Sequence, residues 1–411
     1  MKKFDKDKYL KNLKFKRNLT KYGKYFYIGV PCVLAVVAGI YFAYSKFSVF
    51  KEEEVVRTTV GEFIYGDVVI GAYIDGEYSN TIPGKNDGYV VKSVSCDNNA
   101  TGSWDNDAWG IVLTNMTKRT KCNVYFEKYT NADFISGIAA NDSVNFASDD
   151  PGKNVRYIGA NPNNYVYFNC SDYSNPTANT CELWRIIGVF NNVTKRDGTK
   201  ENLVKIIRDE SIGNIAWDDN NVNDWSTATL QQNLNSGTYY TTTLKNDTTR
   251  NAIEEVVWNL GGTGSYTSAS NGLASHFYGY ERGTTVYSGR PTTWTGKIGL
   301  MYPSDYGYAT SGGTTKDRAD CLAKELYNWD SSTFSDCKGN DYLFNASNVQ
   351  WTLAPRSDYA YIVFGVYTGG HVGSNGALNT YAVRPALFLK SNIQVDKGTG
   401  EKSNPYTLKM Q

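Results

Sequence analysis

The sequence is poor in histidine and has no closely spaced pair of cysteines. His276 and His371 are its only two histidines in 411 residues, and no Cys-x-x-Cys occurs. Structural zinc sites draw their ligands from cysteine and histidine, usually with such a pair, so these absences argue against zinc. Neither histidine is accompanied by Gly-x-Ser-x-Gly, the nucleophile elbow of many serine hydrolases. Zinc sites and Ser-His-Asp chemistry are therefore not indicated.

Most of the chain also lacks an excess of positive charge. The first 24 residues hold ten Lys/Arg and two Asp, a formal charge of +8, whereas the whole chain carries only +1. The remaining residues, 25–411, therefore sum to about −7. Surfaces that bind nucleic acids are basic because they neutralise phosphates. No nucleic-acid partner is expected.

A stretch without any charge, residues 25–44, follows this basic start. About 20 apolar helical residues cross the ~30 Å hydrocarbon layer of a membrane, and flanking Lys/Arg stay in the cytoplasm. The pattern predicts a basic cytoplasmic tail at 1–24, a transmembrane helix at 25–46 and a juxtamembrane spacer at 47–57, with the C-terminus outside. A cleaved signal peptide is disfavoured by the poor cleavage site Ala43-Tyr44-Ser45, and a buried core helix by the lack of a polar stripe. Abundant Lys, Asn and Tyr are typical of genomes with low GC content, which indicates a bacterium. The predicted location is therefore a bacterial cell membrane, which the chain crosses in a single pass.

Cysteine usage indicates an oxidising environment for the rest of the chain. Cys32 lies within the uncharged stretch, and the other six cysteines follow it. Six cysteines allow many connectivities, so the sequence alone cannot fix the pairing, and bridges between sequence neighbours are the simplest arrangement. Each such disulfide stabilises a fold by about 2–4 kcal/mol by restricting the unfolded chain. The six form three local couples, Cys96 and Cys122, Cys170 and Cys181, and Cys321 and Cys337.

Beyond the uncharged stretch, the patterning indicates two folded units. Short β-branched and aromatic runs separated by Asp-Gly and Pro-Gly turns predict a small all-β domain, a β-sandwich, at residues 58–128. The polar residues 129–153 are weakly patterned and are interpreted as a linker. Residues 154–411 begin and end with strand-like runs and contain apolar helical spacings at 253–260 and 319–326, which predicts an α+β domain.

Several motifs of this last unit resemble a known domain. They are Trp225-Ser226-Thr227 before Leu234-Asn235, the run Trp351-Thr352-Leu353-Ala354-Pro355-Arg356-Ser357, a Gly-x-Val at Gly370, and Val383-Arg384-Pro385-Ala386-Leu387. Between about Tyr157 and Lys390 the chain resembles an uncharacterised domain of Gram-positive bacterial surface proteins. That domain is related in fold to C-type lectins and to the formylglycine-generating sulfatase-modifying factors. The resemblance implies a C-type-lectin-like architecture but no activity, since this fold carries binding more often than catalysis.

No catalytic constellation is recognisable in the sequence. Formylglycine generation needs a redox-active pair of thiols in the active site, whereas these cysteines fall into three separate couples. Their even number also leaves no thiol nucleophile. A glycosidase that uses paired carboxylates stays open as an alternative, because six acidic residues could meet in space. They are Asp209, Glu210, Asp218, Asp219, Glu281 and Asp305.

Calcium is a further alternative. The run Asp218-Asp219-Asn220-Asn221-Val222-Asn223-Asp224 is dense in the oxygen ligands that calcium prefers. A polar turn that leads into a helix cap explains the run equally well. The Glu-Pro-Asn and Gln-Pro-Asp tripeptides of sugar-binding C-type lectins are missing. No cofactor is predicted, and calcium stays the one alternative.

The long Gly/Ser/Thr/Tyr-rich stretch at residues 261–295 is either a functional loop or a misread element. Its aromatic and arginine side chains, with their neighbours, are of the types that concentrate binding energy and stack on sugar rings, although each could equally pin the loop to the core. The sequence therefore predicts a membrane-anchored bacterial cell-surface protein with a C-type-lectin-like head for recognition or adhesion, its ligand a glycan or a surface protein. The alternatives are an ectoenzyme acting on cell-wall or host glycans and a non-catalytic structural envelope protein. The candidate ligand-binding residues are Tyr278, Tyr280, Arg282, Tyr287, Arg290, Trp294, Tyr306 and Tyr308.

Overall fold

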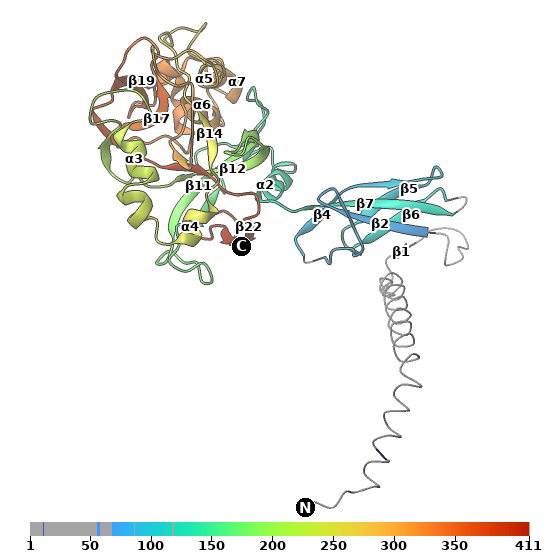
Figure 1. Ribbon diagram of the computed structural model, residues 1–411. Coiled ribbons are helices and arrows are strands. Elements are labelled where there is room, and N and C mark those ends of the chain that lie inside the picture. Colours follow the sequence, from blue (N-terminus) through green and yellow to red (C-terminus); the bar gives the residue numbers. More distant parts are fainter. Residues whose placement is uncertain (1–10, 12–55, 58–67, 86, 117–118, 411) are drawn as a thin grey trace, which may run out of the picture. The chain divides into compact units, whose positions relative to one another are not determined.

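The computed structural model describes residues 11, 56–57, 68–85, 87–116 and 119–410 (Figure 1). Contacts between Cα atoms divide the chain into a first unit, Met1–Lys128, and a second unit, Tyr129–Gln411. The predicted cytoplasmic tail apart from residue 11, the predicted transmembrane helix and most of the predicted spacer lie outside the described residues.

The prediction of a single-pass membrane protein requires correction. In the part of the chain that the structure describes, no helix combines the length and apolar character needed to cross a membrane. The prediction rested on residues 25–46, which lie outside the described part. The described structure therefore does not support the predictions of membrane anchoring and of a location in the bacterial cell membrane.

The first unit contains two β-sheets around one apolar core. Its strands are β1 Val56–Arg57, β2 Val68–Ile74, β3 Glu77–Ser79, β4 Tyr89–Cys96, β5 Thr101–Asp105, β6 Gly110–Thr114 and β7 Thr120–Lys128. One sheet has the order β3-β2-β7-β4 and the other β1-β6-β5. Ile111 and Leu113 of one sheet are buried in the same cluster as Val124 and Phe126 of the other. Two sheets that share a core in this way form a small sandwich.

The second unit is built mainly from β-sheet (Figure 1). Its strands are β8 Phe146–Ala147, β9 Val155–Tyr157, β10 Tyr165–Phe168, β11 Glu182–Thr194, β12 Lys200–Arg208, β13 Asn214–Ala216, β14 Val256–Asn259, β15 Thr293–Gly296, β16 Ile298–Gly299, β17 Gln350–Pro355, β18 Ile362–Val366, β19 Val372–Gly376, β20 Thr380–Ala382, β21 Ala386–Phe388, β22 Gln394–Lys397 and β23 Thr407–Lys409. The largest sheet has the order β16-β21-β12-β11-β9-β8, with β10 also paired to β11, and the next has the order β13-β20-β17-β18-β19. Residues 184–190 of β11 are buried without interruption, so this central strand is covered on both faces.

The helices of the second unit are short. They are α2 Asn131–Ala139, α3 Thr229–Asn235, α4 Asp247–Ala252, α5 Ala274–Glu281, α6 Pro303–Ala309, α7 Arg318–Leu322 and α8 Ser335–Gly339. The spacing at 319–326 predicts one longer helix, whereas α7 ends at Leu322. The stretch at 261–295 is no structureless loop, because it contains α5 and most of β15.

The prediction of an α+β fold is therefore wrong, because the second unit consists mainly of β-strands and its helices are short. Residues 253–260 show why the sequence pattern was misleading. Ile253, Val256, Val257 and Leu260 have helical spacing, but α4 ends at Ala252 and β14 begins at Val256. Val256 and Trp258 are buried while the residues beside them are half-buried, which is the alternation of a strand. A short apolar run satisfies both periods, and here the pairing of β14 with β15 decides in favour of the strand.

Residues 129–153, interpreted from sequence as a linker, are folded as part of the second unit. Thr130 caps α2 through its side chain, and the carboxylate of Asp133 reaches back to the Thr130 backbone, which is a complete capping box. Strand β8 pairs with β9. The polar composition of this segment thus reflects helix caps and turns.

Three disulfides are present, and each joins sequence neighbours. Cys96 on β4 lies opposite Cys122 on β7 and is bonded to it. The other two bonds close short loops of the second unit, Cys170–Cys181 before β11 and Cys321–Cys337 between α7 and α8. This is the simplest of the pairings that the sequence left open.

Candidate functional site

A small pocket lies in the second unit where four connections meet. Its cavity volume is about 10 Å³, the space of a single water-sized group. Its walls come from the turn before α3, the residue after β14, the segment before β15 and the end of β17. The lining residues are Asn223, Asp224, Trp225, Leu260, Arg290, Pro291 and Pro355, and this site is called the Arg290 pocket below.

The turn that carries three of these residues is organised by Asp218. Its carboxylate accepts hydrogen bonds from the backbone N–H groups of Asn220 (3.1 Å), Val222 (2.9 Å) and Thr229 (3.0 Å). The acidic run that sequence analysis considered for calcium is therefore a turn held by its own backbone amides. Among the described residues, no group of three or more His, Cys, Asp or Glu is placed to hold a metal ion.

Asn223 presents a buried acceptor without a hydrogen-bond donor. Its side chain is 1% exposed, and its Nδ2 donates to the carbonyl oxygens of Arg356 (2.9 Å), Tyr359 (2.8 Å) and Ile362 (3.0 Å). These three carbonyls fix the orientation of the amide, because a flip would set its oxygen against theirs. The Oδ1 that remains is buried and accepts no hydrogen bond from the described chain.

Trp225 carries a buried hydrogen-bond donor that lacks an acceptor among the described residues. Its residue is 1% exposed, and its ring packs against Trp217 at 5.1 Å and meets Trp294 edge to face at 6.3 Å between centroids. Within the described residues its Nε1 has no acceptor. Leaving a buried N–H group without a hydrogen bond costs about 1–3 kcal/mol. A ligand atom that accepts a hydrogen bond from Nε1 of Trp225 would remove this cost.

Arg290 carries the third polar atom that lacks a hydrogen-bond partner among the described residues, and its positive charge lies close to Asp224. Its Nη2 donates to the carbonyl of Ala360 at 3.3 Å, and its Nη1 lies 3.9 Å from Oδ2 of Asp224. Its Nε is buried and has no acceptor in the described part of the chain. Because Asp224 offsets the guanidinium charge, the pocket combines two N–H donors and one carbonyl acceptor with little net charge.

The predicted candidates separate into three groups. Arg290 lines the pocket, Trp294 packs behind Trp225, and the ring of Tyr287 lies 5.8 Å from the guanidinium of Arg290. Tyr306 and Tyr308 belong to α6, every residue of which is buried. Both side chains are therefore part of the core, and neither residue lines the Arg290 pocket.

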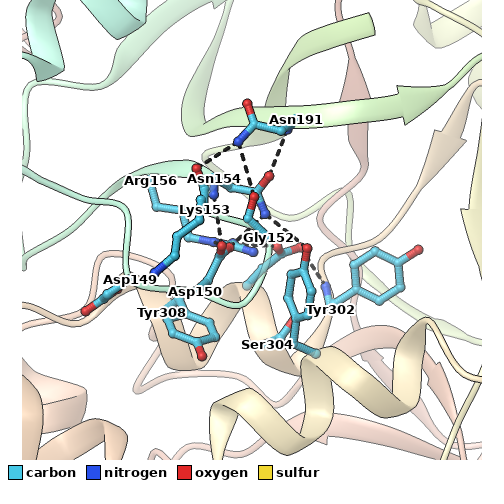
Figure 2. Close-up of polar contacts among 12 residues, drawn as sticks. Asp149, Asp150, Gly152, Lys153, Asn154, Arg156, Asn191, Tyr302, Ser304 and Tyr308 are labelled. Atoms are coloured by element: carbon cyan, nitrogen blue, oxygen red, sulfur yellow. Dashed lines mark hydrogen bonds and ion pairs between the residues drawn. The ribbon is translucent and has the colours of Figure 1, made fainter. Parts of the chain in front are cut away.

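The third group, Tyr278, Tyr280 and Arg282, lies on α5 or at its end. The guanidinium of Arg282 stacks on the ring of Tyr278 at 3.4 Å, and the Tyr278 hydroxyl accepts from Nδ2 of Asn154 at 3.2 Å. Asn154 connects these residues to the buried polar network in Figure 2, where it bonds both Asp150 and Asn191. These candidates therefore border a structural network and lie outside the Arg290 pocket lining.

At the centre of that network, two buried cations share one buried carboxylate. Asp305 accepts from Nη1 of Arg156 at 2.9 Å and from Nζ of Lys205 at 2.6 Å, and Arg156 also bonds Asp150 at 2.6 Å. Burial alone would raise the pKa of Asp305, but Lys205 and Arg156 outweigh it and hold that pKa well below its ordinary value. Burial lowers the pKa of Lys205 in spite of Asp305.

Glu281 is the second buried carboxylate of this region. Ser304 donates to it through both its backbone N–H and its hydroxyl, and Arg282 lies 3.0 Å away. Burial raises the pKa of Glu281 to about 7, and Arg282 offsets only part of this effect. Of the six acidic residues considered for a glycosidase, Glu281 and Asp305 do approach each other, but both are buried among structural partners, with exposures of 1% and 0%. This pair does not have the open cleft that a paired-carboxylate mechanism needs.

Sequence reasoning found Arg290 and its neighbours but missed Asn223, Trp225, Leu260 and Pro355. Two signals were present. The acidic run ended at Asp224, and Trp225 opened one of the motifs of the resemblance. What could not be foreseen was that the backbone carbonyls of residues 356–362 fix the amide of Asn223 from more than 130 positions away in the sequence.

No protein-family model, curated protein or solved structure matches the chain. The function of the Arg290 pocket therefore has to be argued from its own geometry.

Proposed function

We propose that the second unit binds carbohydrate without catalysis, and that a neutral sugar ring lies at the mouth of the Arg290 pocket with one hydroxyl group inside it. One observation carries the proposal. Three buried polar atoms that lack hydrogen bonds within the described chain, Asn223 Oδ1, Trp225 Nε1 and Arg290 Nε, belong to residues that line one pocket. A sugar hydroxyl both donates and accepts, so adjacent hydroxyls of one ring satisfy an acceptor and two donors together.

The other walls of the pocket support the same class of ligand. Leu260, Pro291 and Pro355 are apolar and suit the C–H surfaces of a sugar ring. Asp224 balances Arg290, so a neutral ligand is favoured over an anion. The cavity volume of about 10 Å³ matches a single water-sized group, so one hydroxyl of a sugar ring enters the pocket while the ring itself lies at its mouth.

The three disulfides agree with this role, because disulfides persist in oxidising environments outside the cytosol, where recognition and adhesion take place. A protein ligand is the competing possibility, and it stays an outcome of the test. The resemblance to C-type-lectin-like domains likewise favours binding over catalysis and remains a prediction.

The test is a binding screen of the full chain against neutral and charged glycans, followed by calorimetric titration with the best monosaccharide. Trp225→Phe keeps an aromatic ring but removes the N–H donor, and we expect its affinity to fall about tenfold, the value of one hydrogen bond. Trp294→Phe is the matched control, because Trp294 packs behind Trp225 and is not part of the pocket lining, and its affinity should stay within about twofold of the wild type.

Equal losses in the two variants would mean that the indole N–H of Trp225 does not bind the sugar. Failure of every neutral sugar to bind, or binding of a protein that Trp225→Phe leaves unchanged, would overturn the proposal.

A further inference from the structure

Exposed tyrosine side chains lie on a segment that is hydrogen-bonded to residues of the Arg290 pocket. The segment between β17 and β18 carries Tyr359 and Tyr361, which are 44% and 42% exposed, and Leu378, 54% exposed, follows β19. They are three of the seven large hydrophobic residues that are exposed in the described part of the chain. Tyr359, Tyr361 and Leu378 are called the tyrosine platform below.

The three residues form one surface. The rings of Tyr359 and Tyr361 lie 6.1 Å apart between centroids and meet edge to face. The carbonyl of Tyr361 accepts from the backbone N–H of Ala377 at 2.7 Å, which sets Leu378 beside the tyrosine segment. Scattered exposed apolar residues need no explanation, but a contiguous group marks an interaction surface.

Hydrogen bonds join this platform directly to the pocket. The carbonyl of Ala360, between the two tyrosines, accepts from the backbone N–H of Asn223 at 2.9 Å and from Nη2 of Arg290 at 3.3 Å. The carbonyl of Tyr359 accepts from Nδ2 of Asn223 at 2.8 Å. Two of the three pocket residues with unpaired atoms, Asn223 and Arg290, are thus the residues that hold the tyrosine segment in place.

The ring of Tyr359 is held before any ligand arrives. The guanidinium of Arg356 lies 5.0 Å from its centroid, and Arg356 is itself fixed by a two-pronged ion pair to Asp358, at 2.8 and 2.6 Å. Aromatic side chains fixed in this way bind with little loss of conformational freedom.

We infer that the tyrosine platform is a second subsite and that the ligand is a chain of at least two linked neutral sugar rings. One ring lies at the mouth of the Arg290 pocket, and the next stacks on Tyr359 or Tyr361. This inference rests on the function proposed above and deepens it, because the pocket alone requires only a single ring.

The test compares a monosaccharide with its linked di- and tetrasaccharides by calorimetric titration of the full chain. For the wild type we expect the oligosaccharides to bind at least tenfold more tightly than the monosaccharide. Tyr359→Ala and Tyr361→Ala should remove most of this gain and leave the affinity for the monosaccharide within about twofold, while Tyr361→Phe should keep the gain because it keeps the ring. Tyr327→Ala, at a tyrosine of similar exposure (41%) outside the platform, is the matched control and should behave as the wild type.

An equal gain in wild type and both alanine variants would overturn the second subsite while leaving the pocket intact. A gain that Tyr327→Ala also removes would mean that the loss does not arise at the platform. If Trp225→Phe has no effect on the monosaccharide, or if no sugar binds, the proposed function fails and the inference fails with it. Selective binding of a tyrosine- or proline-rich peptide that depends on Tyr361 would replace the sugar chain by a protein ligand.

Discussion

Replacing Asp305 with Asn is expected to lower the free energy of unfolding by about 3–5 kcal/mol. The side chains of Asp305, Arg156 and Lys205 are all 0–2% exposed, and Asp305 contacts both cations. After the substitution Arg156 keeps the carboxylate of Asp150, but Lys205 has no carboxylate beside it, only the neutral amide and aromatic rings such as Tyr302 at 4.5 Å and Trp258 at 5.2 Å. A buried ammonium without a carboxylate is strongly destabilising, and cation–π contacts of about 1–2 kcal/mol do not replace the missing charge.

Urea unfolding of the full chain, followed by tryptophan fluorescence, measures this loss. Asp247→Asn is the matched control, since Asp247 also pairs with an arginine, Arg250 at 2.8 Å, but its side chain is 87% exposed. Exposed pairs contribute about 0–1 kcal/mol, so this variant should unfold close to the wild type. Similar losses in the two variants would show that burial of the Asp305 network is not what makes it stabilising.

A second large effect is expected from pH and arises at Glu281. Its pKa is raised from 4.5 to about 7 by burial. Between these two values the folded chain keeps a proton that the unfolded chain has released, so the free energy of unfolding falls as the pH rises. The stability contributed by the protonated form is present below about pH 4.5 and is lost as the pH passes 7, and the loss is about 3 kcal/mol.

Glu281→Gln isolates this contribution. The amide is neutral at every pH; its oxygen can accept from the backbone N–H of Ser304 and its NH₂ group can donate to the Ser304 hydroxyl, so the variant should gain up to about 3 kcal/mol relative to the wild type between pH 5 and pH 8. The measurement is urea unfolding of both proteins over this range, because the difference between them cancels groups that titrate in both. Glu210→Gln, at an exposed glutamate, should give a curve parallel to the wild type. A parallel curve for Glu281→Gln would contradict the assignment.

The sequence could predict those features of the fold that depend on neighbouring residues. Alternating β-branched runs predicted a small β-sandwich, and the described strands β2 to β7 lie in that range. Where a short apolar run fitted two periods, as at Val256 and Val257, the choice depended on pairing with β15, which lies more than 30 residues further along the chain. The segment with Asp150 is interpreted as a linker for a similar reason. Asp150 pairs with Arg156, and Arg156 also pairs with Asp305, which lies far along the chain.

The site could be predicted in part. Arginine and aromatic residues in a glycine-rich stretch drew attention to Arg290, Trp294 and Tyr287, all of which lie at or near the pocket. The same reasoning did not foresee that Tyr306 and Tyr308 are core residues, because residue type does not show that α6 is buried on every side. Which polar atoms stay unpaired depends on the whole tertiary structure, so no local pattern could single out Asn223 or Trp225.

In the proposed complex the indole N–H of Trp225 donates to a bound neutral sugar. Titration of the ¹⁵N-labelled full chain with the best-binding sugar tests this hydrogen bond when the indole N–H resonances are followed by NMR, with Trp225→Phe to assign the signal of Trp225. We expect this resonance to move furthest and to saturate together with the calorimetric binding curve, while the resonance of Trp184, which is buried and not part of the pocket lining, stays in place. If a sugar binds and the Trp225 resonance does not move, the indole N–H does not donate to it.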